Sequence, residues 1–340
     1  MMKVALDAMG GDFAPAVNVE GAIEAARENR SIRVILVGDE SAISRELKDR
    51  KYPSDRITIQ PASEVVTMAE SPSIAIRKKK NSSIHVGVKL VQSGEADGFV
   101  SAGHSGVVMA TSLLFLGKAK GVDRPAIATV MPAIKGAFIL LDVGATVDCK
   151  PENLLQFALM GNTYCRMIMG KKNPRVALLS IGEEDIKGNE MTKEAFKLIE
   201  KTDVKFIRNI EGKDIFTGKA DVIVCDGFTG NITLKVSEGL AEAILKMLKK
   251  EVSSISAGKI GYLLIKPAIR NFKKRTDYDE YGGAPLLGIN GTSIISHGRS
   301  SAKAIKNAVT VASSISEKKV HEAIATAIAS DLQEREHTVS

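Results

Sequence analysis

Short apolar runs, each closed by a glycine-rich turn, recur along the chain and constrain its fold more than any other feature. Their apolar residues are continuous rather than alternating, which indicates strands that are buried on both faces of a sheet. Most runs are followed by a helical pattern, which is typical of βαβ units. The sequence therefore predicts a doubly wound, mostly parallel sheet in an α/β/α sandwich. The six clearest runs are Val4–Ala8, Arg33–Val37, Gly98–Val100, Phe138–Leu141, Val176–Leu179 and Val222–Cys225.

The 340 residues contain no low-complexity linker, no shift in composition and no repeat of fixed period. A chain of this length can form one domain or two, and this uniformity favours a single α/β catalytic domain over residues 1–340. One stretch departs from the pattern. Residues 251–278 interleave apolar side chains with Lys and Arg around Pro267, which interrupts a helix. We expect a projecting amphipathic helical hairpin there.

Charge and composition narrow the class of partner. The formal net charge of +7 favours anionic partners such as phosphate, although solubility alone explains it equally well. Aromatic residues make up 4% of the chain and Trp is absent, which argues against a nucleic-acid surface that stacks bases. Cys149, Cys165 and Cys225 have neither disulfide nor metal-ligand spacing. Without an apolar leader or a membrane-spanning run, the sequence predicts a cytoplasmic protein that at most lies on a membrane.

Glycine loops with polar side chains follow the predicted strands. In an open parallel sheet, ligands bind outside the carboxyl ends of the strands, and glycine lets a backbone N–H approach an anion. One such loop is ordinary turn chemistry, but six of them on one edge predict a phosphate-handling site. The spacings of the dinucleotide fingerprint, the P-loop and the hydrolase nucleophile elbow are all absent. The five histidines show no metal-ligand spacing, so we predict neither a metal nor a cofactor.

Two histidines and one lysine stand out beside these loops. His104 lies inside a glycine loop, and His297 precedes Gly298 after a strand-like run. His297 fits a site residue or a satisfied structural histidine equally well. Lys187 precedes a predicted helix, where the helix dipole disfavours a cation. It is therefore a candidate anion ligand, with a solvated surface lysine as the alternative.

Ten segments carry a resemblance to a known family. They are DAMGGD (Asp7–Asp12), RKKKNSS (Arg77–Ser83), SAGHSG (Ser101–Gly106), GVDRPA (Gly121–Ala126), LLDVGATVD (Leu140–Asp148), KPENL (Lys150–Leu154), KGNE (Lys187–Glu190), DGFTGN (Asp226–Asn231), YGGAPLLG (Tyr281–Gly288) and HG (His297–Gly298). In this order they resemble the PlsX family of bacterial phosphate acyltransferases, nearly end to end. The family more often has Asn where this chain has His104.

The resemblance implies a reaction in which long-chain acyl-ACP and inorganic phosphate give acyl phosphate and free acyl carrier protein, at the start of bacterial phospholipid synthesis. It also implies a homodimer with a fold similar to phosphotransacetylases and isocitrate dehydrogenases. A membrane glycerol-3-phosphate acyltransferase would consume the product. The alternatives are a phosphotransacetylase that uses acyl-CoA, a non-catalytic scaffold for carrier protein and membrane, and, least favoured, a nicotinamide dehydrogenase.

Direct attack by phosphate on the thioester requires no serine or cysteine nucleophile, only positioning and oxyanion stabilisation. On this interpretation the catalytic candidates are Lys187, Asn189, Asn231 and His104. The candidates for binding phosphate or substrate are Asp7, Gly10, Gly11, Asp12, Ser101, Gly103, Ser105, Gly106, Asp142, Gly144, Asp148, Asp226, Gly227, Thr229, Gly230, Gly282, Gly283 and His297.

The predicted hairpin suits an anionic membrane surface, because each basic residue near such a surface contributes about 1 kcal/mol. Its membrane-contact candidates are Leu263, Leu264, Lys259 and Lys266. The alternative is a contact with the dimer mate. The basic balance of the chain also favours docking of an acidic carrier protein.

Overall fold

The computed structural model describes residues 1–254, 261, 265–267, 272 and 278–339. Its centre is an eleven-stranded sheet in the order β3-β2-β1-β4-β11-β10-β5-β6-β9-β7-β8. The strands are β1 (Met2–Asp7), β2 (Ile32–Gly38), β3 (Ile57–Pro61), β4 (Gly98–Ser101), β5 (Ala126–Pro132), β6 (Ala137–Leu141), β7 (Arg175–Leu179), β8 (Lys205–Ile210), β9 (Val222–Val224), β10 (Ala284–Leu287) and β11 (Ser293–Ile295).

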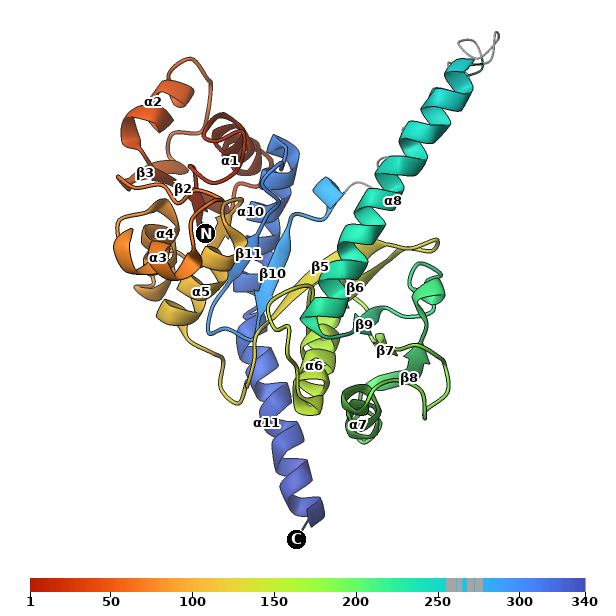
Figure 1. The fold of residues 1–340 in the computed structure, drawn as a ribbon. Coiled ribbons are helices and arrows are strands. Elements are labelled where there is room, and N and C mark those ends of the chain that lie inside the picture. Colours follow the sequence, from red (N-terminus) through yellow and green to blue (C-terminus); the bar gives the residue numbers. More distant parts are fainter. Residues whose placement is uncertain (255–260, 262–264, 268–271, 273–277, 340) are drawn as a thin grey trace.

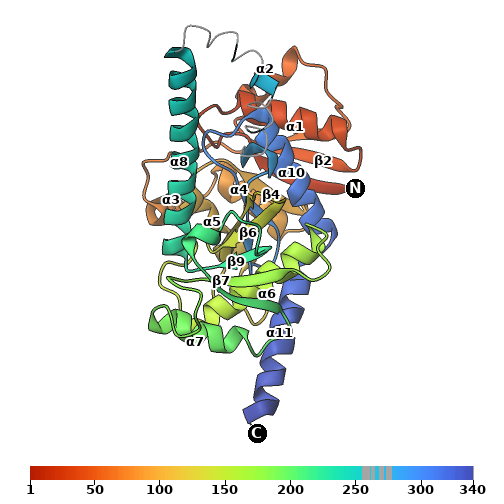
Figure 2. The same cartoon turned by 90° about the vertical axis from the view of Figure 1, so that its right-hand side faces the viewer.

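Helices cover both faces of the sheet (Figures 1 and 2). They are α1 (Ala16–Glu28), α2 (Glu40–Lys48), α3 (Pro72–Lys78), α4 (Ser83–Gln92), α5 (Ser105–Leu116), α6 (Pro151–Met167), α7 (Glu190–Ile199), α8 (Gly227–Ser254), α10 (Ala302–Glu317) and α11 (Val320–Val339). Two short 3₁₀ helices, Gly212–Asp214 and Tyr278–Glu280, lie in the connections.

Alternate residues of the central strands enter different cores. Val4 and Leu6 of β1 pack in one core with α1, α6, α7, α10 and α11, whereas Ala5 between them packs with α3, α4 and α5. Both faces are therefore buried, as continuous apolar strands require. This confirms the predicted α/β/α sandwich with a doubly wound, mostly parallel sheet.

The strand directions correct the expectation of one row of loops on a single edge. β1, β2, β3, β4 and β11 form one parallel set, and β6, β7, β8 and β9 form another. Between the sets, β10 is antiparallel to both β11 and β5, and β5 is antiparallel to β6. Three reversals leave the two sets running in opposite directions, so their loops form two groups.

The two groups of loops nevertheless meet near the middle of the sheet. β10 pairs with β11 through its first two residues and with β5 through its last two. Along these registers Ile294, near the end of β11, and Leu141, the last residue of β6, lie in the same row of the sheet. The carboxyl ends of the two oppositely directed sets therefore face each other across β10 and β5.

Helix α8 is 28 residues long and projects from the sheet (Figure 1). At 1.5 Å per residue it spans about 42 Å. Of the predicted membrane-contact residues, Leu263, Leu264 and Lys259 lie outside the described residues. Lys266 is helical and exposed. Within the described part of the chain, no helix is long and apolar enough to cross a membrane.

Candidate active site

Asp7, the last residue of β1, organises the first group of loops. Its carboxylate is buried and accepts hydrogen bonds from the Ser101 hydroxyl at 2.7 Å and the Met9 N–H at 3.0 Å. Ser101 in turn accepts from the Gly103 N–H at 3.0 Å. Burial raises the pKa of Asp7, and hydrogen bonds, first those from Ser83 and Ser101, oppose that shift. Asp7 therefore ties the loop after β1 to the loop after β4 and to the start of α4.

Glycine is required in this group because the two loops touch. A Cβ on Gly10 would lie 2.4 Å from Asp7 Oδ2 and 2.6 Å from the Gly103 nitrogen. Gly11 also has a φ of +101°, a conformation that L side chains rarely adopt. Gly10 and Gly11 thus allow the two loops to pack closely against each other. From the sequence, these glycines were instead expected to bind phosphate.

His104 precedes the first turn of α5, and the N-terminus of this helix is open. Helices α4, α7 and α8 are capped by their own Ser82, Asn189 and Asp226 side chains, whereas α1 and α3 have no side-chain cap. His104 makes no such cap, and no acceptor within the described residues takes the N–H groups of Ser105 and Gly106. Such N–H groups carry the positive end of the helix dipole and bind anions.

The His104 side chain adds a second polar group at this helix start. Its Nδ1 is buried and has no hydrogen-bond partner among the described residues. An imidazole nitrogen in this position can donate to an anion or accept from a hydroxyl. The start of α5 therefore combines free backbone donors with an unpartnered side-chain nitrogen.

The loop after β11 closes over the first group. The Asp12 N–H donates to the Gly298 carbonyl at 2.8 Å, and Arg299 lies 3.9 Å from the Asp12 carboxylate. His297 is exposed, and its Nδ1 accepts from the Arg299 N–H at 3.1 Å. Gly282 and Gly283 have positive φ and pack against α10 and β11 respectively, so they shape this region without reaching the open helix start.

Asp142 organises the second group of loops as Asp7 does the first. Its buried carboxylate accepts four backbone N–H bonds, from Ile127, Gly144, Ala145 and Thr146, at 2.6 to 3.1 Å. Burial raises its pKa, and the backbone donors, first Ala145 and Thr146, oppose the shift. One side chain therefore fixes the whole loop after β6.

The N-terminus of α8 packs directly on that loop. The Gly227 N–H donates to the Thr146 carbonyl at 2.9 Å, and a Cβ on Gly230 would lie 1.9 Å from the Asp142 carbonyl oxygen. Asp226 caps the helix by accepting from the Thr229 N–H at 2.8 Å and its hydroxyl at 2.7 Å. The N–H groups of Gly227, Thr229 and Gly230, which were expected to bind phosphate, are thus engaged within the protein.

Asn231 is exposed on α8, and its Cβ lies 3.9 Å from the position of a Cβ on Gly144. Its amide makes no hydrogen bond with any described residue, so it is free for a substrate. Val147, Phe228 and Ile232 nearby are exposed apolar side chains. Asp148 is exposed beside them. The second group therefore offers one amide in partly apolar surroundings.

Two thiols lie in this group, and both are unreactive. Burial, the largest cause, raises the pKa of Cys149 to about 12, with Asp142 and Asp226 adding to the shift. Burial raises the pKa of Cys225 well above its usual value. The nucleophile in thiol chemistry is the thiolate, so neither cysteine is suited to form an acyl-enzyme.

Lys187 and Asn189 lie on the loop after β7, next to β9 in the sheet. The Asn189 side-chain oxygen accepts from the Thr192 N–H at 2.9 Å and therefore caps α7. Lys187 is exposed, and its ammonium has no ion-pair partner in the described part of the chain. The Lys187 ammonium is therefore available to a substrate, whereas the Asn189 side-chain oxygen is already used to cap α7.

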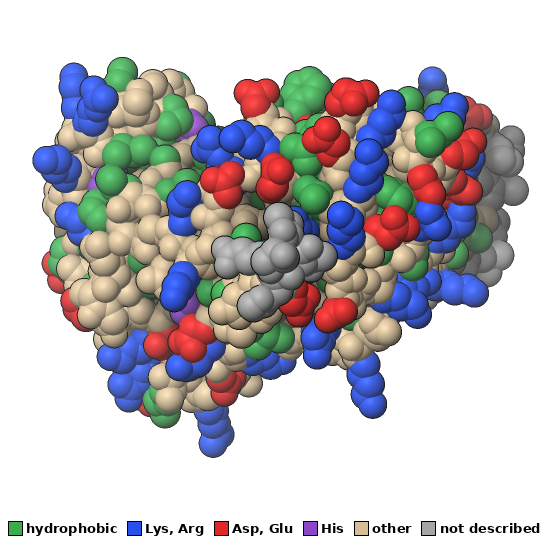
Figure 3. Space-filling view, turned by 90° about the horizontal axis from the view of Figure 1, so that it is seen from below, with side chains coloured by type: hydrophobic (Ala, Val, Ile, Leu, Met, Phe, Trp, Pro, Cys, Tyr) green, Lys and Arg blue, Asp and Glu red, His purple; other side chains and the backbone are tan. Residues whose placement is uncertain are grey.

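The two groups of loops face each other. Ala145 of the second group packs against the core that contains Val107 and Val108 of α5. Glu242 of α8 has a lowered pKa, caused first by Lys246 and in smaller part by the charge of Arg299 in the first group. The surface is hollowed between the lobe of α3–α5 and the lobe that carries α6–α8 (Figure 3).

Sequence reasoning missed two residues that build the site. Asn18 of α1 is buried and donates to the carbonyls of Gly10 at 2.8 Å and Ala8 at 3.1 Å, which holds the first loop. Ser83 donates to Asp7. Ser83 lay in the RKKKNSS segment but had no assigned role, and nothing in the sequence around Asn18 distinguishes it from other helical residues.

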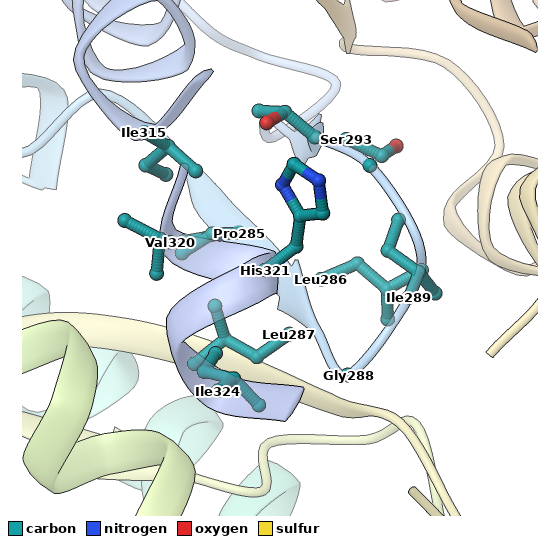
Figure 4. Close-up of a pocket in the computed structure, with 12 residues that line it drawn as sticks. Pro285, Leu286, Leu287, Gly288, Ile289, Ser293, Ile315, Val320, His321 and Ile324 are labelled. Carbon is teal, nitrogen blue, oxygen red and sulfur yellow. The ribbon is translucent and has the colours of Figure 1, made fainter. Parts of the chain in front are cut away.

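A separate cavity lies between β10, β11, the end of α10 and the start of α11, and it is too small for substrate. It measures about 10 Å³, and the ring of His321 points into it toward Ser293 (Figure 4). That volume is close to the minimum for a single water molecule. Elsewhere in the described chain, no three His, Cys, Asp or Glu side chains are grouped to hold a metal ion.

The fold is similar to solved phosphotransacetylases. A phosphotransacetylase from Streptococcus pyogenes matches with a TM-score of 0.61 at 18% identity, over 93% of this chain and 94% of that one. EutD phosphotransacetylase from Staphylococcus aureus matches with a TM-score of 0.58 at 17% identity, with the same coverage. At this identity the likeness concerns the fold alone, and it confirms the predicted phosphotransacetylase-like architecture.

Curated relatives are much closer in sequence. A phosphate acyltransferase of Thermodesulfovibrio yellowstonii is 58% identical over 96% of this chain and 94% of its own length. One of Geotalea uraniireducens is 53% identical over 95% of this chain and 93% of its own length. The family model described as "Fatty acid synthesis protein" matches residues 2–323. The chain therefore belongs to this family, the PlsX family of phosphate acyltransferases.

Proposed function

We propose that the protein transfers an acyl group from a thioester to inorganic phosphate, which gives acyl phosphate and a free thiol. The observation that carries this proposal is the open N-terminus of α5, where the Ser105 and Gly106 N–H groups and the unpartnered Nδ1 of His104 converge. A phosphate ion bound there faces the second group of loops, where the thioester would lie. The names of the curated relatives support the same reaction.

In the reaction, a phosphate oxygen attacks the thioester carbon and forms a tetrahedral intermediate. Collapse of the intermediate breaks the carbon–sulfur bond and releases a thiolate, which then takes a proton from water. The protein must hold the two reactants together and stabilise the oxyanion. Asn231 and Lys187 suit the second task, because neither side chain is engaged by another described residue. Val147, Phe228 and Ile232 offer an apolar surface for the acyl chain.

We propose direct attack by phosphate, without an acyl-enzyme, and the unreactive thiols support this mechanism. Cys149 and Cys225 remain protonated at neutral pH because burial raises their pKa values. Rapid quenching of the protein with labelled acyl donor in the absence of phosphate tests this step. We expect no label on the protein, and a trapped acyl-enzyme would overturn direct attack.

The donor we propose is long-chain acyl-ACP, with acyl-CoA as the alternative. The exposed apolar side chains near Asn231 favour a long chain over an acetyl group. The test is to incubate the purified protein with phosphate and either palmitoyl-ACP or acetyl-CoA, and to trap acyl phosphate with hydroxylamine. Turnover with palmitoyl-ACP alone supports the proposal, and turnover with acetyl-CoA alone favours the alternative. If neither donor gives product, the protein is better explained as a non-catalytic scaffold for carrier protein and membrane.

We also propose that the protein works as a homodimer through α8. Four exposed apolar residues at intervals of three and four form a stripe along this helix: Val236, Leu240, Ile244 and Met247. That spacing places them on one face, and such a stripe on a long projecting helix indicates a protein contact. A Val236→Glu, Leu240→Glu variant should become monomeric in light scattering, whereas Lys246→Glu on the same helix should remain dimeric.

The remaining predictions extend this proposal. We propose that the whole chain forms one catalytic unit and that the segment 251–278 rests on an anionic membrane, where a glycerol-3-phosphate acyltransferase would take the acyl phosphate. Sedimentation with phosphatidylglycerol vesicles of the wild type and of a Leu263→Glu, Leu264→Glu variant tests the membrane contact. Unchanged sedimentation with intact activity would exclude the segment as the anchor.

A further inference from the structure

The basic segment formed by the last residues of α3 and the two residues after it has no role in the chemistry described so far. It comprises Arg77, Lys78, Lys79 and Lys80, the start of the RKKKNSS motif. Arg77, Lys78 and Lys80 are exposed, and none of the three has a hydrogen-bond or ion-pair partner among the described residues. Unpaired basic side chains in a row are a preformed surface for an anionic partner.

The carboxylates beside this segment do not cancel its charge. Lys79 is held inward by Glu70 at 2.6 Å and by the Val65 carbonyl at 2.5 Å, and hydrogen bonding to Lys79, the largest cause, lowers the pKa of Glu70 to about 2. Glu64 accepts the Asn81 N–H at 2.8 Å. Lys79 balances Glu70, so the three outward cations outnumber the one remaining carboxylate.

The segment is also tied to the candidate active site at both ends. Pro72, at the start of α3, lies 3.3 Å from the position of a Cβ on Gly106 in the open turn of α5. Ser83, three residues after Lys80, donates to Asp7. Helix α3 has seven residues and is therefore only about 10 Å long. The exposed cations thus lie at the far end of α3, about 10 Å from the proposed phosphate site.

Apolar side chains accompany the charges. Met68 is 60% exposed and Ile74 is 52% exposed, just before and within α3. On the lobe of α3–α5, the part that borders the hollow shows hydrophobic side chains, the basic side chains gather toward its outer edge, and few acidic side chains are visible on its upper part (Figure 3). Protein interfaces combine an apolar centre with a charged rim, whereas a small anion needs no exposed apolar residues.

We infer that this surface docks the acyl donor as an acidic carrier protein, whose thioester-bearing arm then reaches the open turn of α5. The inference rests on the proposed function and names the surface that selects a protein-borne donor. Charge complementarity at the rim of an interface acts mainly on the rate of association. The surface should therefore govern kcat/KM for the protein-borne donor and leave the chemistry at the active site unchanged.

The test compares two triple variants that change the net charge equally. Arg77→Glu, Lys78→Glu, Lys80→Glu alters the proposed surface. Lys197→Glu, Lys201→Glu, Lys205→Glu is the matched control, because its exposed lysines lie at the end of α7 and the start of β8. Each variant is assayed with palmitoyl-ACP and with the palmitoyl thioester of N-acetylcysteamine, which carries no protein and no charge.

For the first variant we expect kcat/KM with palmitoyl-ACP to fall at least about tenfold at low salt, as loss of electrostatic steering does. The difference should shrink as salt shortens the Debye length from about 10 Å at 0.1 M. Turnover of the N-acetylcysteamine thioester should not change, and the control variant should match the wild type with both donors.

Three outcomes would overturn the inference: an unchanged kcat/KM with palmitoyl-ACP, an equal loss with both donors, or an equal loss in the control variant. A variant that keeps its kcat/KM but no longer sediments with phosphatidylglycerol vesicles would assign the surface to a membrane instead. If the wild type turns over neither donor, the proposed function itself fails, which is a distinct result.

Discussion

Replacing Asp142 with Asn is the sharpest test of how the second group of loops is held. Three of its four backbone donors, from Ile127, Gly144 and Ala145, point to Oδ1, whereas only Thr146 points to Oδ2. An Asn side chain can keep its oxygen on the side of the three donors. Its NH₂ group then faces the Thr146 N–H, which lies 2.6 Å from Oδ2 in the wild type. In the variant the Thr146 N–H therefore faces the NH₂ donor of Asn, whereas in the wild type it faces a carboxylate oxygen that accepts its hydrogen bond.

The cost follows from these contacts. Losing a hydrogen bond to a charged acceptor costs about 1.5–3 kcal/mol, and a buried N–H left unsatisfied costs about 1–3 kcal/mol more. Removing a buried charge, whose pKa burial has raised, offsets part of this. We expect a net loss of about 2–3 kcal/mol, which for a chain of this size lowers Tm by roughly 3–4 °C.

Activity should fall as well, because the Thr146 carbonyl accepts from Gly227 and so positions α8 with Asn231. A displacement of about 1 Å in a positioned group can cost about 100-fold in rate. Calorimetry measures the Tm, and the hydroxylamine assay measures the rate. Asp148→Asn is the matched control: this exposed side chain should change stability by less than about 0.5 kcal/mol. An Asp142→Asn protein with wild-type Tm would refute the reasoning.

Three further predictions follow from the site. His104→Ala should lower kcat/KM for phosphate by about 100-fold, the usual cost of losing one positioned donor, while His104→Asn should restore part of it; an unchanged dependence of rate on phosphate concentration would exclude the start of α5 as the phosphate site. Cys149→Ala should keep kcat within a few-fold of the wild type, because its thiol has a pKa of about 12; loss of turnover with an intact fold would contradict direct attack. Burial raises the pKa of Asp7 above the unfolded value of about 3.9, so the folded state binds the extra proton and stability from this group rises as pH falls through its folded pKa. The Tm of the wild type relative to Asp7→Asn should therefore rise between pH 7 and about pH 4.5, and a fall would contradict that sign.

The sequence by itself determined the layers and the local elements, because these depend on residues close together in the chain. Continuous apolar runs gave strands buried on both faces, and the helix expected through Leu116 spans Ser105–Leu116. The order of the glycine loops was also sufficient to recognise the family. Cys225, interpreted as a core residue, is 3% exposed.

Only the tertiary structure decided which loops pack against each other or cap helices, and which keep N–H donors free for a ligand. The antiparallel strands β5 and β10 split one expected row into two facing groups, and strand direction in a sheet depends on pairing between distant segments. Ser101 reaches Asp7 across 94 residues, and Gly227 reaches Thr146, so which N–H groups are engaged is invisible in local sequence. The glycine loops after β1, β6 and β9 consequently serve packing and capping, whereas the start of α5 keeps its donors free. A backbone donor is open to a ligand only where folding brings it no partner, and that is a property of the assembled chain.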